Sequence, residues 1–160
     1  MPANKKFKSS LLAKCASVMV IGFIMSFLTV TVFAASVQGS KWTFNVGAKE
    51  YENYSKLTYS SSSDWFIGGT SINCNTSSCA AGYLGAKPNI YKQKSNGTYS
   101  IVASGVWRYT TEGCWGYTNG ATTYSSPDSG LYMCQGQSAV YYNGGYQTDW
   151  TYTTPFINID

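Results

Sequence analysis

The sequence contains no histidine. That absence excludes serine and cysteine hydrolases with a histidine base, and transpeptidases that need a histidine beside the cysteine. It also argues against a thiolate metal site, because such sites usually include histidine among their ligands. Glycine-rich phosphate loops with their lysine and calcium loops of the Asp-x-Asp type are missing too. We therefore expect a protein that is not an enzyme and holds no cofactor or metal.

Charge is scarce as well, at 11% of all residues, although the formal net charge is +4. Four of the eleven basic residues lie before residue 15, and the remaining seven equal the seven acidic residues in number. A neutral region with one arginine, Arg108, lacks the basic surface that binding to nucleic acid requires. We expect no nucleic-acid partner.

The sequence has one long apolar run, and it lies near the N-terminus. The run over 16–34 has no charged residue and follows Lys5, Lys6, Lys8 and Lys14. Together with small residues at 32 and 34, this order predicts a secretory signal peptide over 1–34, cut before Ala35. The alternative is a retained membrane anchor, since the run is long enough to span a bilayer. The prediction is a secreted protein of a Gram-positive bacterium, with one domain over 35–160 and no stable membrane anchor.

Cysteine is present in a number that suits export. Cys15 leaves with the signal peptide, and four cysteines remain: Cys74, Cys79, Cys114 and Cys134. An even number in a small exported domain predicts two disulfides. We favour Cys74–Cys79, whose four-residue loop can close on itself, and then Cys114–Cys134. The longer loop would stabilise the fold by roughly 3 kcal/mol.

No stretch after residue 34 shows sustained helical periodicity, whereas turn signals are frequent. Asn-Gly pairs stand at 96–97, 119–120 and 143–144, and this dipeptide favours the type I′ turn of a β-hairpin. The first hairpin would pair 90–93 with 100–103. The second would place Trp115 opposite Tyr124, and the third Tyr141 opposite Tyr146.

Alternation predicts the strands themselves. From 99 to 109 the odd positions are mostly apolar and the even positions mostly polar, as in a half-buried strand. We expect further strands at 41–46, 56–60, 65–72, 131–135, 138–142, 147–152 and 156–159. Many short strands with glycine-rich turns predict an all-β fold, an antiparallel β-sandwich of immunoglobulin-like or jelly-roll-like type.

The segment Asp128-Ser-Gly-Leu-Tyr-Met-Cys134 resembles the end of an immunoglobulin variable domain. There the tyrosine forms a corner and the cysteine bridges to the other sheet. The chain departs from that pattern because no tryptophan follows Cys74 or Cys79 before Trp107. We interpret the segment as a tight turn that enters a strand with a buried Tyr132.

Catalysis by two carboxylates remains open, as in a small glycosidase. Glu112 is the best single candidate, since Cys114 and Trp115 are close in sequence and could shape a pocket. The alternative is a solvated loop acid just before a hairpin, which we favour.

Aromatic residues give the one positive indication of function. All fourteen tyrosines and all five tryptophans follow residue 34, and these side chains suit recognition surfaces. The alternative is that they only fill a pleated sheet. We predict binding of a cell-wall glycan, another glycan or another envelope component. The candidate residues flank two predicted hairpin tips: Trp115, Tyr117, Tyr124, Tyr141, Tyr142 and Tyr146.

A second resemblance concerns Gly105-Val106-Trp107 and Ala139-Val140-Tyr141-Tyr142-Asn143. With the leader and the aromatic composition, these motifs resemble the lactococcin-type bacteriocins. That resemblance implies an exported β-sandwich that blocks wall synthesis by engaging the lipid-linked precursor. This chain is longer, carries cysteines and lacks histidine, which departs from that family. Three functions therefore stand as hypotheses: an envelope or glycan binder, a secreted antagonist of bacteria, and a small glycosidase.

Overall fold

The computed structural model describes residues 34–160, which form eleven strands and no helix. Residues 1–33 lie outside the described part, and with them nearly all of the predicted signal peptide. In the described part, no helix exists that could span a membrane. Residues 33–160 form one compact unit.

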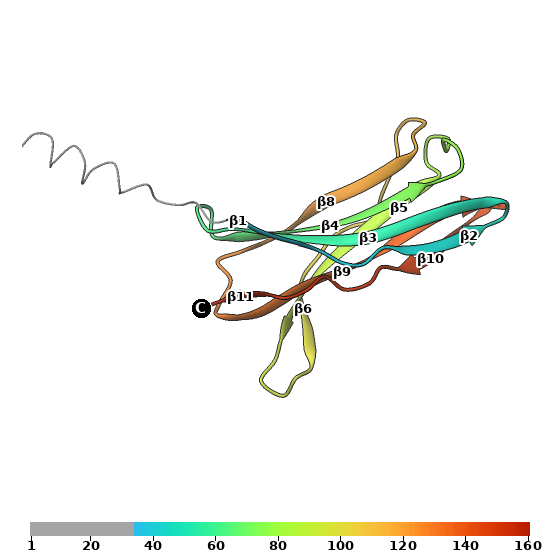
Figure 1. Cartoon of the computed structure of the whole chain (residues 1–160). Coiled ribbons are helices and arrows are strands. Elements are labelled where there is room, and N and C mark those ends of the chain that lie inside the picture. The colour runs from blue at the N-terminus through green and yellow to red at the C-terminus, as the bar shows by residue number, and fades with distance from the viewer. Residues whose placement is uncertain (1–33) are drawn as a thin grey trace, which may run out of the picture. The chain divides into compact units, whose positions relative to one another are not determined.

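The first sheet is antiparallel and centred on two long strands, β3 (Lys49–Ser60) and β4 (Trp65–Cys74). β8 (Gly116–Ser125) pairs with β4. Two short strands, β1 (Ala34–Gln38) and β2 (Trp42–Val46), share the other side of β3 (Figure 1).

The second sheet repeats this plan around β9 (Gly130–Tyr142) and β5 (Leu84–Gln93). β6 (Tyr99–Ser104) and β7 (Arg108–Tyr109) both pair with β5. β10 (Gly145–Trp150) and β11 (Ile157–Ile159) share the free side of β9. Both sheets therefore end on one side in a broken edge of two short strands.

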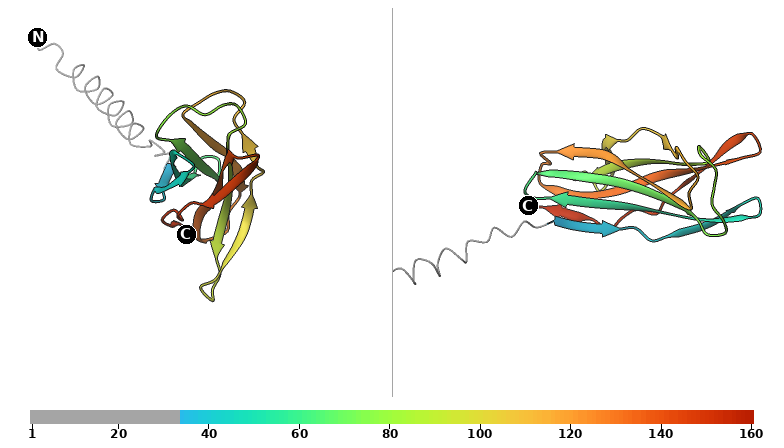
Figure 2. Two further views of the ribbon diagram at one scale, coloured as in Figure 1. Left: turned by 90° about the vertical axis from the view of Figure 1, so that its right-hand side faces the viewer. Right: turned by 90° about the horizontal axis from the view of Figure 1, so that it is seen from above.

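Side chains from both sheets meet in two apolar clusters. The first cluster contains Val46, Tyr51, Ile72, Cys74, Cys79, Leu84 and Val140. The second contains Leu57, Phe66, Ile90, Tyr132, Cys134 and Ile157. Because each cluster draws on both sheets, the two sheets form the layers of a sandwich (Figure 2), and the predicted antiparallel β-sandwich is confirmed.

A belt of buried polar side chains separates the two clusters. The hydroxyls of Ser55 and Thr151 lie 2.7 Å apart, and Asn53 Nδ2 donates to Ser138 Oγ at 2.7 Å. Thr151 also accepts the backbone N–H of Gly136 at 3.0 Å. These bonds offset the cost of burying polar groups, and they hold the segment between β10 and β11 against the middle of β3 and β9.

Two of the three Asn-Gly hairpins are confirmed. Asn143 and Gly144 have φ of 49° and 84°, as a type I′ turn requires, and Tyr141 pairs with Tyr146. The 96–97 turn joins β5 to β6 as predicted, with a register irregularity at Ile90, but it is not of type I′ because Gly97 has positive φ and Asn96 does not.

The second predicted hairpin, at 119–120, is wrong. Asn119 lies inside β8, where its buried side-chain amide donates to the backbone oxygens of Ala86 and Val106. Tyr124 pairs with Phe66 of β4, so Trp115 does not face it. Because these hydrogen bonds join the two sheets, they outweigh the tendency of Asn119-Gly120 to form a turn.

The predicted strand over 99–109 is also wrong in part, because it breaks between β6 and β7. A Cβ at Gly105 would overlap Thr122 Oγ1 and lie 3.0 Å from Pro88, so the backbone there lies against the other sheet. Ile101, on the predicted apolar face, is 55% exposed. Val102, on the predicted polar face, packs against the second cluster, as does Ala103 of the predicted apolar face.

The interpretation of 128–134 is confirmed as a turn that enters a strand with a buried tyrosine. Tyr132 is fully buried, and its hydroxyl donates to the backbone oxygen of Asp128 at 2.7 Å. Ser126 and Gly130 have positive φ on either side of that acceptor.

Candidate functional site

Five aromatic rings form a continuous row at one end of the outer face of the second sheet. Neighbouring ring centroids lie 6.0 Å apart from Trp107 to Tyr109, 4.6 Å from Tyr109 to Tyr146 and 5.3 Å from Tyr146 to Tyr141. Tyr83 continues the row 5.2 Å from Tyr141. We call Tyr83, Trp107, Tyr109, Tyr141 and Tyr146 the aromatic strip.

Strand alternation places these rings outside the core. Along β9 the even positions Tyr132, Cys134 and Val140 belong to the core clusters, so Tyr141 points to the opposite face. Tyr146 is its cross-strand partner and therefore lies on the same face.

Gly85 makes room for the middle of the strip. It pairs with Tyr109 across β5 and β7, and a Cβ there would lie 2.5 Å from two atoms of the Tyr109 ring. The tyrosine ring therefore occupies the space that a side chain at residue 85 would fill.

The strip carries no formal charge at neutral pH, and one hydroxyl anchors it. Tyr146 Oη donates to the backbone oxygen of Gly82 at 2.7 Å. Burial, and then the neighbouring Tyr109 and Tyr141, raise the pKa of Tyr146. Tyr83 is 40% exposed and Tyr146 45% exposed, so ring surface remains open to a ligand. A neutral aromatic surface of this kind suits the C–H faces of sugars.

The structure brings together two of the six predicted binding residues, Tyr141 and Tyr146. Trp115 is 60% exposed but stands apart, with its backbone oxygen bonded to the N–H of Cys74. Tyr117 packs against the first cluster and Tyr124 against the second.

Tyr142, the remaining predicted residue, lies on the other face of β9. A Cβ on Gly47 would lie 2.6 Å from its ring, which places that ring beside the β2–β3 turn.

Sequence reasoning missed Tyr83, Trp107 and Tyr109 as site residues. Trp107 and Tyr109 share the odd-numbered face of the predicted strand over 99–109, so alternation already set them on one side. Tyr83 carries no such signal, because it precedes β5 in an irregular segment. Its place depends on Tyr83 O, which accepts the backbone N–H of Tyr141 at 2.8 Å.

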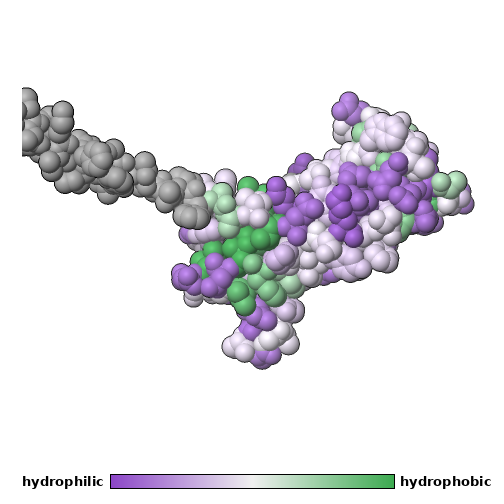
Figure 3. Space-filling model, in the orientation of Figure 1, coloured by the Kyte–Doolittle hydropathy of each residue, from purple (hydrophilic) through white to green (hydrophobic). Residues whose placement is uncertain are grey.

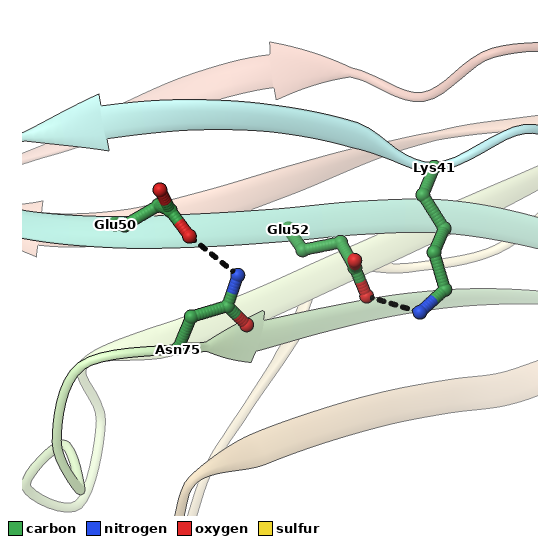
Figure 4. Close-up of polar contacts among 4 residues, drawn as sticks. All are labelled: Lys41, Glu50, Glu52 and Asn75. Atoms are coloured by element: carbon green, nitrogen blue, oxygen red, sulfur yellow. Dashed lines mark hydrogen bonds and ion pairs between the residues drawn. The ribbon is translucent and has the colours of Figure 1, made fainter.

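The outer face of the first sheet is polar by comparison. Lys41 Nζ lies 2.8 Å from Glu52 Oε1, and Asn75 Nδ2 donates to Glu50 Oε1 at 2.9 Å (Figure 4). Hydrophilic side chains gather over the part of the molecule away from β1 and β11 (Figure 3). Glu50 and Glu52 are both held by these partners.

Glu112 stands exposed in the loop before Cys114, and within residues 34–160 no hydrogen bond or ion pair involves it. The surroundings of Glu112 therefore give no support to its predicted role as a catalytic acid. Nor does the described part contain a group of three or more His, Cys, Asp or Glu side chains arranged to hold a metal.

All four cysteines of the described part are free thiols. Cys114 packs against the first cluster, whereas Cys134 belongs to the second. The backbone of Cys114 lies opposite Cys79 of the first cluster, with two N–H···O bonds of 2.7 and 3.0 Å between them. The structure therefore contains neither predicted disulfide, Cys74–Cys79 or Cys114–Cys134.

Cys74 and Cys79 both belong to the first cluster. Burial disfavours the Cys74 thiolate, but backbone bonds from Ser77 and Thr76 outweigh it and lower the pKa of Cys74. Burial raises the pKa of Cys79. Burial also raises the pKa of Cys134 to about 12, which leaves that thiol unreactive.

No protein-family model, no curated protein and no solved structure matches this chain. The fold itself defines the class, an all-β protein of two antiparallel sheets.

Proposed function

We propose that this chain is a small exported protein without enzymatic activity that binds a glycan of a cell envelope through the aromatic strip. The observation that carries the proposal is the row of five rings, spaced 4.6 to 6.0 Å apart on one sheet face. Rings on a rigid sheet bind at a low entropic cost, and successive rings can stack on successive sugars of an extended chain.

Export is part of the proposal and rests on the leader sequence. In an oxidising medium, Cys74, whose pKa is lowered, would form a disulfide with Cys79 of the same cluster. That bridge would tie the end of β4 to the segment that leads to Tyr83. An immunoglobulin-like or jelly-roll-like type of sandwich belongs to the proposal as well.

A second candidate function, a secreted antagonist of other bacteria, is favoured by one observation. The two motifs that resemble lactococcin-type bacteriocins contribute Trp107 and Tyr141, and both residues belong to the strip. On this alternative, the strip would engage a sugar-bearing precursor of the wall rather than the finished wall.

The test uses residues 35–160, which contain both sheets and both core clusters, mixed with purified Gram-positive cell wall and with growing cells. Trp107→Ala combined with Tyr141→Ala should weaken binding to the wall at least tenfold, as expected for two lost stacking contacts. Trp115→Ala is the matched control, because this ring is exposed and lies outside the strip.

Binding to the wall without growth arrest would support the binder, and growth arrest by the unaltered protein would favour the antagonist. Equal binding by the double variant, with unchanged circular dichroism, would refute a role for the strip in either case.

A further inference from the structure

A second group of aromatic side chains lies at the broken edge of the sandwich, where β2 of the first sheet meets the end of β10. Trp42 comes from β2, and Trp150 and Tyr152 come from the end of β10 and the segment after it. They line a hollow of about 330 Å³ together with Asp149, Gln135 and Thr151. We call Trp42, Asp149, Trp150 and Tyr152 the edge cage.

The cage is held in shape by hydrogen bonds to its carboxylate. Trp42 Nε1 donates to Asp149 Oδ2 at 2.8 Å, and the backbone N–H of Trp150 donates to Oδ1 at 2.8 Å. The rings of Trp42 and Tyr152 stand edge to face, with centroids 5.7 Å apart. Gln135 Nε2 donates to Thr151 O at 3.0 Å and holds the backbone behind the hollow.

The charge of Asp149 has no cation to balance it. Both donors to this carboxylate are neutral groups, and neither ion pair of the described residues includes it. Lys41, next to Trp42 in sequence, is paired with Glu52 instead. Asp149 is also the one lining residue that is charged at neutral pH.

All three rings keep open surface. Trp42, Trp150 and Tyr152 are between 40% and 49% exposed, although each is large and apolar. An uncompensated carboxylate in a hollow lined by exposed aromatic residues attracts cations through its charge, and the negative faces of aromatic rings add a cation–π attraction.

We propose that the edge cage binds an organic cation with a quaternary ammonium group, such as the trimethylammonium head of choline. A quaternary ammonium donates no hydrogen bond, so it would leave in place both N–H bonds to the Asp149 carboxylate. Its positive charge is spread over the methyl groups, and these groups can contact the faces of aromatic rings. A hard metal ion would need six or more oxygen ligands, and the cage offers one carboxylate.

This inference does not depend on the aromatic strip. The two sites share no residue, so either can fail without the other. The cage would add recognition of a charged head group to a protein whose other aromatic surface is neutral.

The experiment titrates residues 35–160 with choline and follows the indole N–H resonance of Trp42, whose proton points at Asp149. The matched probe is 3,3-dimethyl-1-butanol, which has the shape of choline without its charge. We expect choline to bind at least tenfold more tightly than this alcohol. Asp149→Asn should weaken choline at least tenfold, with little effect on the alcohol.

A second variant guards against a loss of folding in Asp149→Asn. Trp150→Leu removes a ring whose side chain makes no described hydrogen bond, and it should also weaken choline several-fold. Trp65→Leu is its control, since Trp65 is equally exposed but lies outside the hollow. Equal affinity for choline and the alcohol, no response to choline at tens of millimolar, or unchanged binding by folded Asp149→Asn would each overturn the proposal.

Two further binding experiments distinguish a lipid head group from other sources of the cation. Binding to phosphatidylcholine vesicles but not to phosphatidylglycerol vesicles would identify a lipid head group. Binding to free choline alone, with no binding to either vesicle, would identify a soluble or polymer-linked choline.

Discussion

The aromatic strip and the edge cage are both built on β9, β10 and their neighbours, but they differ in charge and in how their rings meet. In the strip five rings touch one another in a row, and no carboxylate or ammonium belongs to it. In the cage the aromatic residues line a hollow together with Asp149, whose carboxylate accepts the N–H of Trp42. Aromatic composition alone therefore does not define a ligand: the same residue types suit a neutral sugar on one surface and a cation on the other.

Among the variants that separate the two sites, we expect the largest effect from Gly85→Ala, which should disrupt the aromatic strip and leave the edge cage intact. The new Cβ would lie 2.5 Å from the ring of Tyr109 and force that ring out of the row. We expect wall binding to fall about tenfold and the free energy of unfolding to fall by about 1–3 kcal/mol, as in other overpacked sites. Choline binding should stay within twofold.

Gly120→Ala is the control for that change, because nothing lies within 4 Å of its added Cβ and its φ is not positive. Pull-down on cell wall and chemical denaturation measure the two effects. Unaltered wall binding by a folded Gly85→Ala protein would show that the row need not be continuous.

Reduction should act more on the strip than on the cage. A Cys74–Cys79 disulfide would close a short loop and stabilise the fold by about 2 kcal/mol. Dithiothreitol should remove that stability and loosen the segment from Cys79 to Tyr83, which supports one end of the strip. Amide exchange should rise there and stay unchanged at Trp42 and Asp149. A melting temperature that does not respond to dithiothreitol would contradict the disulfide.

Alkaline pH should destabilise the fold through Tyr51 of the first cluster. Tyr51 is buried beside Cys79, and burial, followed by that thiol, raises its pKa far above the usual range. The folded protein therefore keeps the phenol proton that the unfolded chain loses above pH 10. Stability present below pH 10 should decline above it, by up to about 1.4 kcal/mol per pH unit for this group.

Tyr51→Phe should flatten that decline, measured by urea denaturation between pH 8 and 11. Part of the slope should remain, because burial also raises the pKa of Tyr91 and Tyr132. An identical slope in both proteins would rule out Tyr51 as a contributor.

The smallest effect is expected from Lys41→Gln, which tests whether Asp149 alone supplies the charge of the cage. Lys41 is engaged by Glu52, whose hydrogen bond and charge raise the pKa of that lysine. Such exposed pairs contribute little to stability. Choline affinity should therefore change less than twofold. A larger gain on removing the lysine would mean that its charge reaches the cage.

Local sequence signals predicted the parts of the fold that local chemistry controls. Asn143-Gly144 forms its turn because both residues tolerate positive φ, and this turn sets Tyr141 opposite Tyr146. Asn119-Gly120 has the same signal but lies within β8, because its amide bonds to backbone of the other sheet. The local preference of Asn-Gly for a turn is therefore weaker than the buried hydrogen bonds that Asn119 forms with residues distant in sequence.

The sequence by itself determined the all-β class, the 141–146 hairpin and the buried Tyr132, since alternation and turn chemistry act between near neighbours. Only the tertiary structure decided which aromatic rings meet. Tyr83, Trp107 and Tyr141 come from three separate segments, and Trp42 reaches Asp149 across 107 residues. Their meeting depends on strand order, register and the glycine at 85, and these arise from long-range packing that no short stretch of sequence encodes.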